Sequence, residues 1–256
     1  MCEDCGCAIP HHVAAVPATV EVNSRLLDAN DRIAAHNRAH FDAHHVLAIN
    51  LMSGPGAGKT SLLEATIDAL KGEFRIAVIE GDLETDNDAR RIRAHGVPAL
   101  QITTGSACHL DAHMIHDALH ALPLDAIDIL FIENVGNLVC PASFDLGQHR
   151  NAVLLSVTEG DDKPAKYPVM FRVADLVMLS KTDLAAVFDD FDPVRAEEAV
   201  RNLANPAPVI AVSARANPRL ETWLDWLRSE VAISRAAQPE ASESTLHHDH
   251  HESVAR

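Results

Sequence analysis

The most informative segment of this chain for its fold is Ser53-Gly54-Pro55-Gly56-Ala57-Gly58-Lys59-Thr60-Ser61. It follows a short apolar run at residues 46–52 and leads into residues 60–71, whose apolar side chains recur at helical spacing. Glycines let backbone amides turn toward a phosphate, and the start of a helix adds the positive end of its dipole. The stretch therefore predicts a phosphate-binding loop between a buried strand and a helix.

The residues of this loop have separate expected roles. We expect Lys59 to reach the β and γ phosphates of a nucleotide and Thr60 to ligate Mg²⁺. The strict pattern has glycine at position 53, where this chain has Ser53, but the neighbouring glycine keeps the turn flexible. The remaining residues expected to cradle phosphates are Gly54, Gly56, Ala57, Gly58 and Ser61.

Outward from the loop, short apolar runs alternate with helical stretches. Strands are expected at residues 46–52, 75–79, 99–103, 127–132, 153–158, 176–179 and 209–212, and helices at 23–41 and near 220–231. Continuous apolar strands separated by helices are typical of a parallel sheet covered on both faces. We predict an α/β P-loop NTPase with a mostly parallel sheet of about seven strands. The expected organisation is a flexible metal-binding arm (1–20), the P-loop domain with a leading helix (21–234), and a disordered histidine-containing tail (235–256).

Composition limits the partners and the compartment. The chain has 256 residues and a formal net charge of −16, which disfavours nucleic acid and anionic membranes as partners. No apolar run approaches the roughly 18 residues needed to cross a bilayer. The first residues lack the pattern of a signal peptide, so a cytoplasmic location is expected.

The segment Ser180-Lys181-Thr182-Asp183 closes a later buried strand and indicates the base. An aspartate here accepts two hydrogen bonds from guanine, whereas adenine would leave it unpaired. Lys181 can lie over the base, and Ser180 replaces the asparagine usual at its position. The backbone at Ser213 and Ala214 is expected to contact the guanine oxygen, so we predict binding of GTP and GDP.

Two acidic positions are candidates for sensing the γ-phosphate. Glu133 can hold the magnesium shell or orient the attacking water, and Gly136 can offer its amide to the phosphate. Asp82 is the expected magnesium contact from the first switch. Asp86 and Asp88 are better interpreted as a solvated helix start, with Asp86 as the N-cap.

Cysteine and histidine predict metal sites. Cys2, Cys5 and Cys7 place three thiols within six residues, and thiolates favour soft or borderline ions such as nickel and zinc. Cys108 and His109 are expected to begin a helix, where a thiol has a lowered pKa and becomes a ready ligand.

Cys140 follows Gly136 closely, so it can complete a second nickel or zinc site with Cys108 and His109, within one chain or across a dimer. A ligand this close to the γ-phosphate sensor can be moved by nucleotide state. His113, His116 and His120 favour a solvated helix face over a metal site. The histidines at 247–251 suit weak metal storage.

Together these motifs resemble the HypB family of nickel-incorporation GTPases, which serve [NiFe]-hydrogenase maturation. The resemblance covers the opening Met-Cys-x-x-Cys-Gly-Cys, the phosphate loop, residues 133–141 and residues 181–183. It implies a GTP-dependent homodimer with slow GTP turnover and a tight nickel site at Cys2, Cys5 and Cys7. It also implies a second nickel or zinc site at Cys108, His109 and Cys140, and delivery of nickel with a HypA-like partner to the hydrogenase large-subunit precursor.

Two alternatives stay open at this point. The GTPases of urease maturation, the UreG family, resemble the chain in its nucleotide-binding motifs, but they typically carry Cys-Pro-His and lack the leading cysteines. A passive nickel or zinc storage protein with a vestigial nucleotide site is the other alternative. The intact Lys59, Thr60, Asp82 and Asp183 argue against it.

Overall fold

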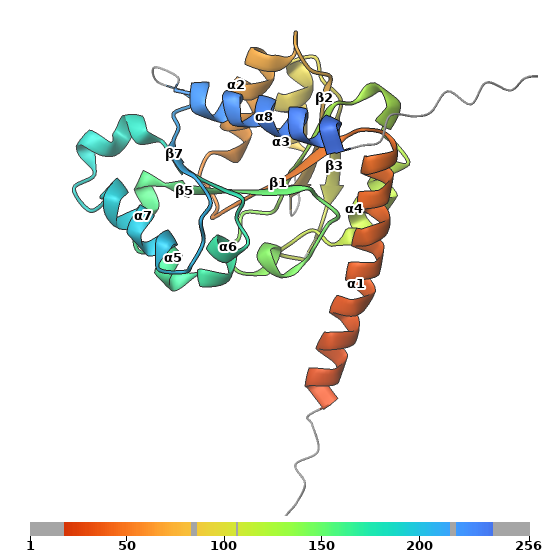
Figure 1. The fold of residues 1–256 in the computed structure, drawn as a ribbon, viewed down its shortest axis with the longest axis horizontal. Helices are drawn as coiled ribbons and strands as arrows, with labels where there is room; N and C mark the ends of the chain where they lie inside the picture. The colour runs from red at the N-terminus through yellow and green to blue at the C-terminus, as the bar shows by residue number, and fades with distance from the viewer. Residues whose placement is uncertain (1–17, 83–85, 106, 216–218, 238–256) are drawn as a thin grey trace, which may run out of the picture.

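The computed structural model describes residues 18–82, 86–105, 107–215 and 219–237, with side chains from residue 26 onward. Its centre is a parallel seven-stranded sheet in the order β3-β2-β4-β1-β5-β6-β7 (Figure 1). The predicted fold class is therefore confirmed. The strands are β1 (Leu47–Ser53), β2 (Ile76–Asp82), β3 (Ala99–Thr103), β4 (Ile129–Glu133), β5 (Arg150–Ser156), β6 (Leu176–Ser180) and β7 (Val209–Ala211).

Helices cover both faces of the sheet (Figure 1). On one face lie α2, α3 and α8, and on the other lie α1 and α4 together with α5, α6 and α7. The helices are α1 (Ala18–Ala43), α2 (Lys59–Leu70), α3 (Asn87–Ala94), α4 (Ala112–Leu119), α5 (Lys163–Lys166), α6 (Pro168–Arg172), α7 (Pro193–Arg201) and α8 (Glu221–Ala237).

The alternation of side chains along β1 divides the core between the two faces. Ile49 and Leu51 point to the α2 and α8 side, whereas Ala48 points to the α1 and α4 side, and all three are fully buried. The apolar stripe predicted near residues 220–231 packs into the first side. Its Trp223 is fully buried and donates its indole N–H to Thr66 Oγ1 at 2.8 Å, so the ring buries no unpaired donor.

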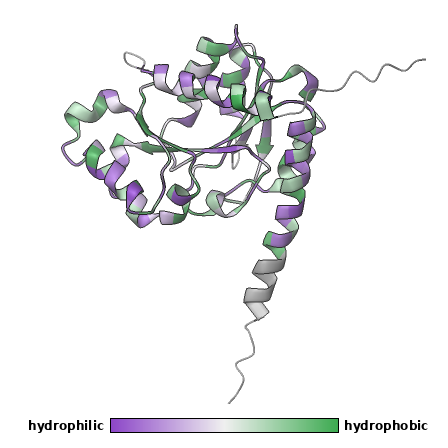
Figure 2. Ribbon diagram, viewed as in Figure 1, coloured by the Kyte–Doolittle hydropathy of each residue, from purple (hydrophilic) through white to green (hydrophobic). Residues whose placement is uncertain are grey.

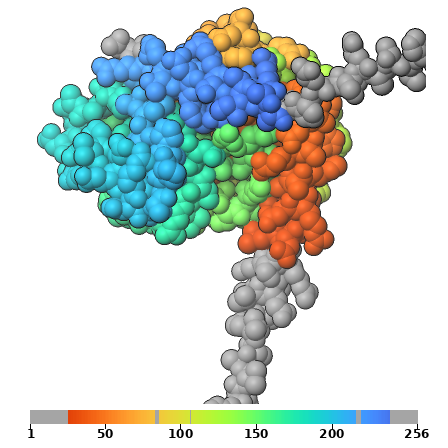
Figure 3. All heavy atoms as spheres, viewed as in Figure 1, coloured from red at the N-terminus to blue at the C-terminus, as the bar shows by residue number. Residues whose placement is uncertain are grey.

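Helix α1 lies beside α4 and extends past the body of the molecule (Figures 1 and 3). Buried Asn37 joins this helix to the rest of the chain, because its Nδ2 donates to the carbonyl oxygens of Ala112 at 2.8 Å and Leu146 at 3.1 Å. Figure 2 shows hydrophilic and hydrophobic residues mixed along α1 and α8, as expected of helices with one packed side and one wet side.

Several element boundaries differ from the expectation. The predicted helix start at Cys108 is wrong, because α4 begins four residues later, where Asp111 caps it by accepting the Met114 N–H at 2.8 Å. Helix α8 continues to Ala237, beyond the expected loss of periodicity after Ser234. No helix in the described part of the chain has the length and apolarity to cross a membrane.

Candidate nucleotide and metal sites

The predicted site residues gather at one edge of the sheet. Strand β1 lies between β4 and β5, so β2 to β4 lie on one side of it and β5 to β7 on the other. In open α/β sheets, ligands bind at such a switch point, beyond the carboxyl ends of the strands. The phosphate loop follows β1 at this edge. Asp82, Glu133 and Ser180 are the last residues of β2, β4 and β6, so the parallel register brings their loops to the same edge.

The phosphate loop has the backbone that its glycines predict. Gly56 and Gly58 have φ angles of 74° and 103°, a region that residues with side chains rarely adopt. Lys59 is buried, and its Nζ donates to Ser53 Oγ at 3.0 Å. The serine that departs from the strict motif therefore holds the lysine ammonium beside the loop.

Gly136 lies directly against this loop. A Cβ atom at Gly136 would stand 2.8 Å from Pro55 Cα, closer than side chains tolerate. Only glycine lets the segment after β4 approach the loop so closely. This contact places the predicted γ-phosphate sensor next to the loop that would carry the phosphates.

A cavity of about 420 Å³ at the loop collects the acidic candidates. Lys59, Thr60, Asp82 and Glu133 all line it, and so does Glu80, which sequence reasoning missed. Thr60 Oγ1 donates to Glu133 Oε1 at 2.9 Å. A glutamate directly after an apolar strand run is itself unusual, and that signal could have identified Glu80.

Glu80 and Glu133 form a buried carboxyl pair, opposite each other on β2 and β4. Burial, followed by the neighbouring Glu133, raises the pKa of Glu80 far above its ordinary value, and burial also raises the pKa of Glu133. Glu80 Oε1 and Glu133 Oε2 have no hydrogen-bond partner within the described chain. Two buried oxygens without partners beside a threonine hydroxyl fit a hard divalent cation such as Mg²⁺.

A second cavity, of about 540 Å³, adjoins the loop on the β6 and β7 side. Lys181, Asp183 and Ala214, three of the residues predicted to bind the base, line it. Asp183 Oδ1 accepts a hydrogen bond from Ser213 Oγ at 2.8 Å, which orients the carboxylate. The sequence suggested a backbone role at position 213, and the structure adds this contact of its hydroxyl.

Ser180 joins this second cavity to the phosphate loop. Its Oγ donates to the carbonyl of Ala57 at 2.8 Å, and Lys181 Nζ donates to the carbonyl of Gly56 at 2.7 Å. The short serine side chain therefore contacts the loop in place of the asparagine that is usual at this position of the motif. This departure from the common motif keeps the two halves of the pocket connected.

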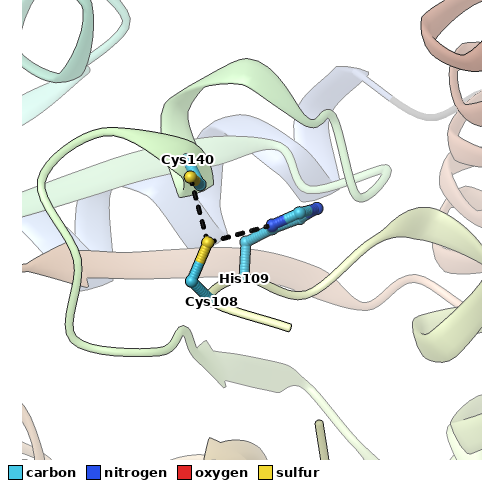
Figure 4. A group of neighbouring side chains, drawn as sticks. All are labelled: Cys108, His109 and Cys140. Atoms are coloured by element: carbon cyan, nitrogen blue, oxygen red, sulfur yellow. Dashed lines mark hydrogen bonds between the residues drawn. The ribbon is translucent and has the colours of Figure 1, made fainter. Parts of the chain in front are cut away.

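Cys108, His109 and Cys140 meet although 32 positions separate the two cysteines (Figure 4). Within the described residues, one donor atom from each lies within 4.8 Å of the other two. Cys108 Sγ is 3.1 Å from Cys140 Sγ and 3.8 Å from His109 Nδ1. Two sulfurs and an imidazole form an incomplete set for a borderline ion such as Ni²⁺ or Zn²⁺.

The surroundings of Cys140 and His109 favour the neutral forms of these two side chains. The hydrogen bond with Cys108, and then burial, raise the pKa of the Cys140 thiol. Burial lowers the pKa of His109, whose ring stacks on Phe144 with centroids 3.9 Å apart. A neutral imidazole keeps its lone pair for a metal, and a bound cation would displace the thiol proton.

Comparison with known proteins places the chain in a family. Residues 47–211 match the CobW/HypB/UreG nucleotide-binding domain. The chain is 51% identical to the hydrogenase maturation factor HypB of Escherichia coli strain K12 over 82% of this chain and 72% of that protein. The chain belongs to the HypB family. It is also similar to the solved HypB from Helicobacter pylori in complex with nickel, with 43% identity, a TM-score of 0.76, and coverage of 83% of this chain and 98% of that one.

A relative from Helicobacter hepaticus, 45% identical over 84% of this chain and 89% of that protein, is a hydrogenase/urease maturation factor HypB. The HypB from Archaeoglobus fulgidus has a solved structure with 40% identity and a TM-score of 0.74, covering 80% of this chain and all of that one. This HypB-family chain therefore shares its P-loop GTPase fold with bacterial and archaeal hydrogenase maturation factors.

Two asparagines connect the nucleotide edge of this HypB-family chain to the cysteine pair. Asn134 Oδ1 accepts the Leu110 N–H at 3.2 Å, and Asn137 Nδ2 donates to the carbonyl of Cys108 at 3.3 Å. Both asparagines lie in the segment that carries Gly136 and ends at Cys140. Residues 133–140 therefore touch the phosphate loop at one end and the thiols at the other.

The remaining candidates of this HypB-family chain lie elsewhere. Cys2, Cys5, Cys7 and the histidines at 247–251 fall outside the described residues. Asp86 stands at the predicted N-cap of α3, but its carboxylate bonds Arg90 and Arg93 and makes no side-chain capping bond.

Proposed function

We propose that this HypB-family chain hydrolyses GTP and uses the nucleotide state to hold or release Ni²⁺ at Cys108, His109 and Cys140. The ion is cargo for the [NiFe]-hydrogenase large-subunit precursor. One observation carries the proposal: residues 133–140 contact the phosphate loop through Gly136 and supply the metal ligand Cys140. A change at the γ-phosphate therefore has a short physical route to the thiols.

The nucleotide half of the proposal rests on the two adjoining cavities. Asp183, oriented by Ser213, selects guanine by accepting its two N–H donors. Lys59 leaves Ser53 to neutralise the β and γ phosphates when a nucleotide binds. Gly136 packs against the loop, and its amide would donate to the third phosphate.

Thr60, Asp82, Glu80 and Glu133 would hold Mg²⁺, because all four line the same cavity and one carboxyl oxygen each of Glu80 and Glu133 lacks a hydrogen-bond partner within the described residues. When bound, the ion neutralises charge on the phosphate oxygens. The cation would take the place of the proton that burial keeps on Glu80, so both buried carboxyls could bind it in their charged forms. Glu133 then orders residues 134–140, and Cys140 moves with them.

Delivery requires that hydrolysis weaken the metal site. To switch the chain almost completely between two conformations, the nucleotide must bind one conformation more tightly than the other by about 5.5 kcal/mol. Three ligands per chain leave the coordination incomplete, so a GTP-stabilised homodimer or a HypA-like partner supplies the remaining ligand. Cys2, Cys5 and Cys7 form the separate tight nickel site.

The test is the Ni²⁺ affinity of the inner site in each nucleotide state. The full chain carries Cys2→Ser, Cys5→Ser and Cys7→Ser, and its affinity is measured by chelator competition with GDP and then with a non-hydrolysable GTP analogue. A difference of tenfold or more, about 1.4 kcal/mol, is expected. Equal affinities would show that the nucleotide acts elsewhere.

Two further variants identify the route within the same background. Cys140→Ala should keep GTP binding and lose the nucleotide dependence of Ni²⁺ affinity. Asn137→Ala keeps all three ligands but breaks the contact with Cys108, so it should bind Ni²⁺ with a smaller nucleotide effect. Ser143→Ala lies exposed in the same 3₁₀ turn (η2, Cys140–Ser143) and serves as the matched control. A full nucleotide effect in Cys140→Ala would exclude this route.

A further inference from the structure

Five histidines on two neighbouring helices and directly after them form a continuous cluster away from the nucleotide edge. His36 and His40 lie on α1 and His44 directly follows this helix, whereas His116 lies on the neighbouring α4 and His120 is its C-cap. Ring centroids are 4.6 Å apart for His36 and His40, 5.2 Å for His36 and His116, and 5.0 Å for His116 and His120. This histidine cluster is distinct from Cys108, His109 and Cys140.

The pair His36 and His40 already has the spacing of two ligands on one ion. Their Nε2 atoms are 3.1 Å apart. Two nitrogens each about 2.1 Å from an ion stand roughly 3.0 to 3.4 Å apart at the angles that octahedral and tetrahedral sites use. His36 is exposed and His40 is half-buried on the long α1 helix, so an ion can reach the pair from solvent.

The hydrogen bonds of Asn37 prepare His116 as a ligand. The Asn37 Nδ2 group donates to two carbonyl oxygens, which fixes the amide with Oδ1 toward the ring. Oδ1 lies 3.3 Å from His116 Nδ1, so Nδ1 must carry the proton that is donated. The lone pair of the neutral ring then resides on Nε2, the tautomer that metal-bound histidines use when the other nitrogen is anchored.

His44 is prepared in the same way by a carboxylate. Its Nδ1 lies 2.6 Å from Asp125 Oδ1, so Nδ1 donates and Nε2 keeps the lone pair. His40, His44, His116 and His120 line a cavity of about 270 Å³ between the two helices.

We propose that the histidine cluster is a metal site in which His36, His40 and His116 bind a borderline divalent transition-metal ion, Ni²⁺ or Zn²⁺. Imidazole nitrogens suit these ions, whereas Mg²⁺ and Ca²⁺ require oxygen ligands. The anchored His116 ring offers Nε2, and the surface pair turns toward it when an ion binds. His44 and His120 flank the ion and can replace a water ligand.

This site would give the chain a place to bind a metal ion through histidines alone, without cysteine ligands. An ion held by imidazoles exchanges without the thiolate bonds of the cysteine sites, so the cluster acts as a loading buffer rather than as a switch. It shares no residue with the nucleotide cavities. Its failure is therefore separable from failure of the proposed GTP-controlled site.

The experiment measures Ni²⁺ stoichiometry of the full chain by equilibrium dialysis at neutral pH. The double variant H36Q/H40Q should bind one equivalent less than the unaltered chain. The matched control is H95Q/H113Q, which removes two histidines that pair with acidic side chains outside the cluster. GTP hydrolysis and the sulfur-to-nickel absorption bands should be the same in all three proteins.

A second measurement needs no variant. One equivalent of Ni²⁺ beyond those needed to saturate the thiol bands should broaden the ring proton signals of His36, His40 and His116 in NMR spectra. The ring signals of His95 and His113 should stay sharp at that point. Unchanged stoichiometry in H36Q/H40Q, an equal loss in H95Q/H113Q, or broadening shared evenly by all histidine rings would each overturn the proposal.

Discussion

The carboxyl pair of Glu80 and Glu133 predicts a pH-dependent stability that a single substitution should remove. Without nucleotide or Mg²⁺, Glu80 is protonated in the folded chain because burial raises its pKa far above neutrality. In the unfolded chain its pKa returns to about 4.5. Between these values the folded state binds one more proton than the unfolded state, so stability falls as pH rises.

The magnitude follows from linkage. Because the folded chain binds one extra proton, its free energy of unfolding falls by about 1.4 kcal/mol for each unit that the pH rises. The fall between pH 5.5 and pH 7.5 is about 2.7 kcal/mol. Glu80→Gln keeps the size of the side chain and donates an N–H in place of the carboxyl O–H. The variant should therefore lose this slope and be the more stable protein at pH 7.5.

The assay is urea unfolding at pH 5.5, 6.5 and 7.5 with nucleotide and metal removed. The difference between the parent and Glu80→Gln slopes isolates this group from the other titrating residues. Glu198→Gln, at an exposed position on α7, is the matched control and should keep the parental slope. If Glu80→Gln kept the parental slope, the extra proton of the folded chain would not reside on Glu80, and the argument for the Mg²⁺ site would fail with it.

Three further predictions concern the nucleotide. Lys59→Ala should reduce GTP hydrolysis at least about 100-fold in a phosphate-release assay, because it removes a phosphate donor, while nickel binding at Cys2, Cys5 and Cys7 persists. Asp183→Asn should weaken GTP binding by about 3 kcal/mol, roughly 100-fold by calorimetry, with no loss of ATP binding. Ser180→Ala removes the hydrogen bond to the loop carbonyl of Ala57 and should weaken GDP binding about fivefold, about 1 kcal/mol, in a fluorescent-nucleotide titration. Tighter ATP binding by Ser180→Ala would contradict its role in joining the pocket.

Local patterns predicted the layered α/β fold because each buried strand and each helix stripe is encoded by neighbouring residues. The phosphate loop, the order of strands and helices, and the apolar face around Trp223 were all predicted this way. The start of α4 was not, because Cys108 and His109 are polar enough to begin a helix in isolation. The chain instead bends at Cys108 and His109, and Asp111 occupies the N-cap position.

The amino-acid sequence was sufficient to predict which chemical groups are available to this protein. They are a lysine and a threonine after a glycine-rich loop, an aspartate that can pair with guanine, and cysteines that can bind a borderline metal ion. Tertiary structure alone decided which of these groups act together. Parallel pairing of β2 and β4 sets Glu80 against Glu133, and packing of α1 on α4 sets His36 beside His116. Such contacts depend on strand register and helix packing between distant segments, and no local sequence pattern encodes those distances.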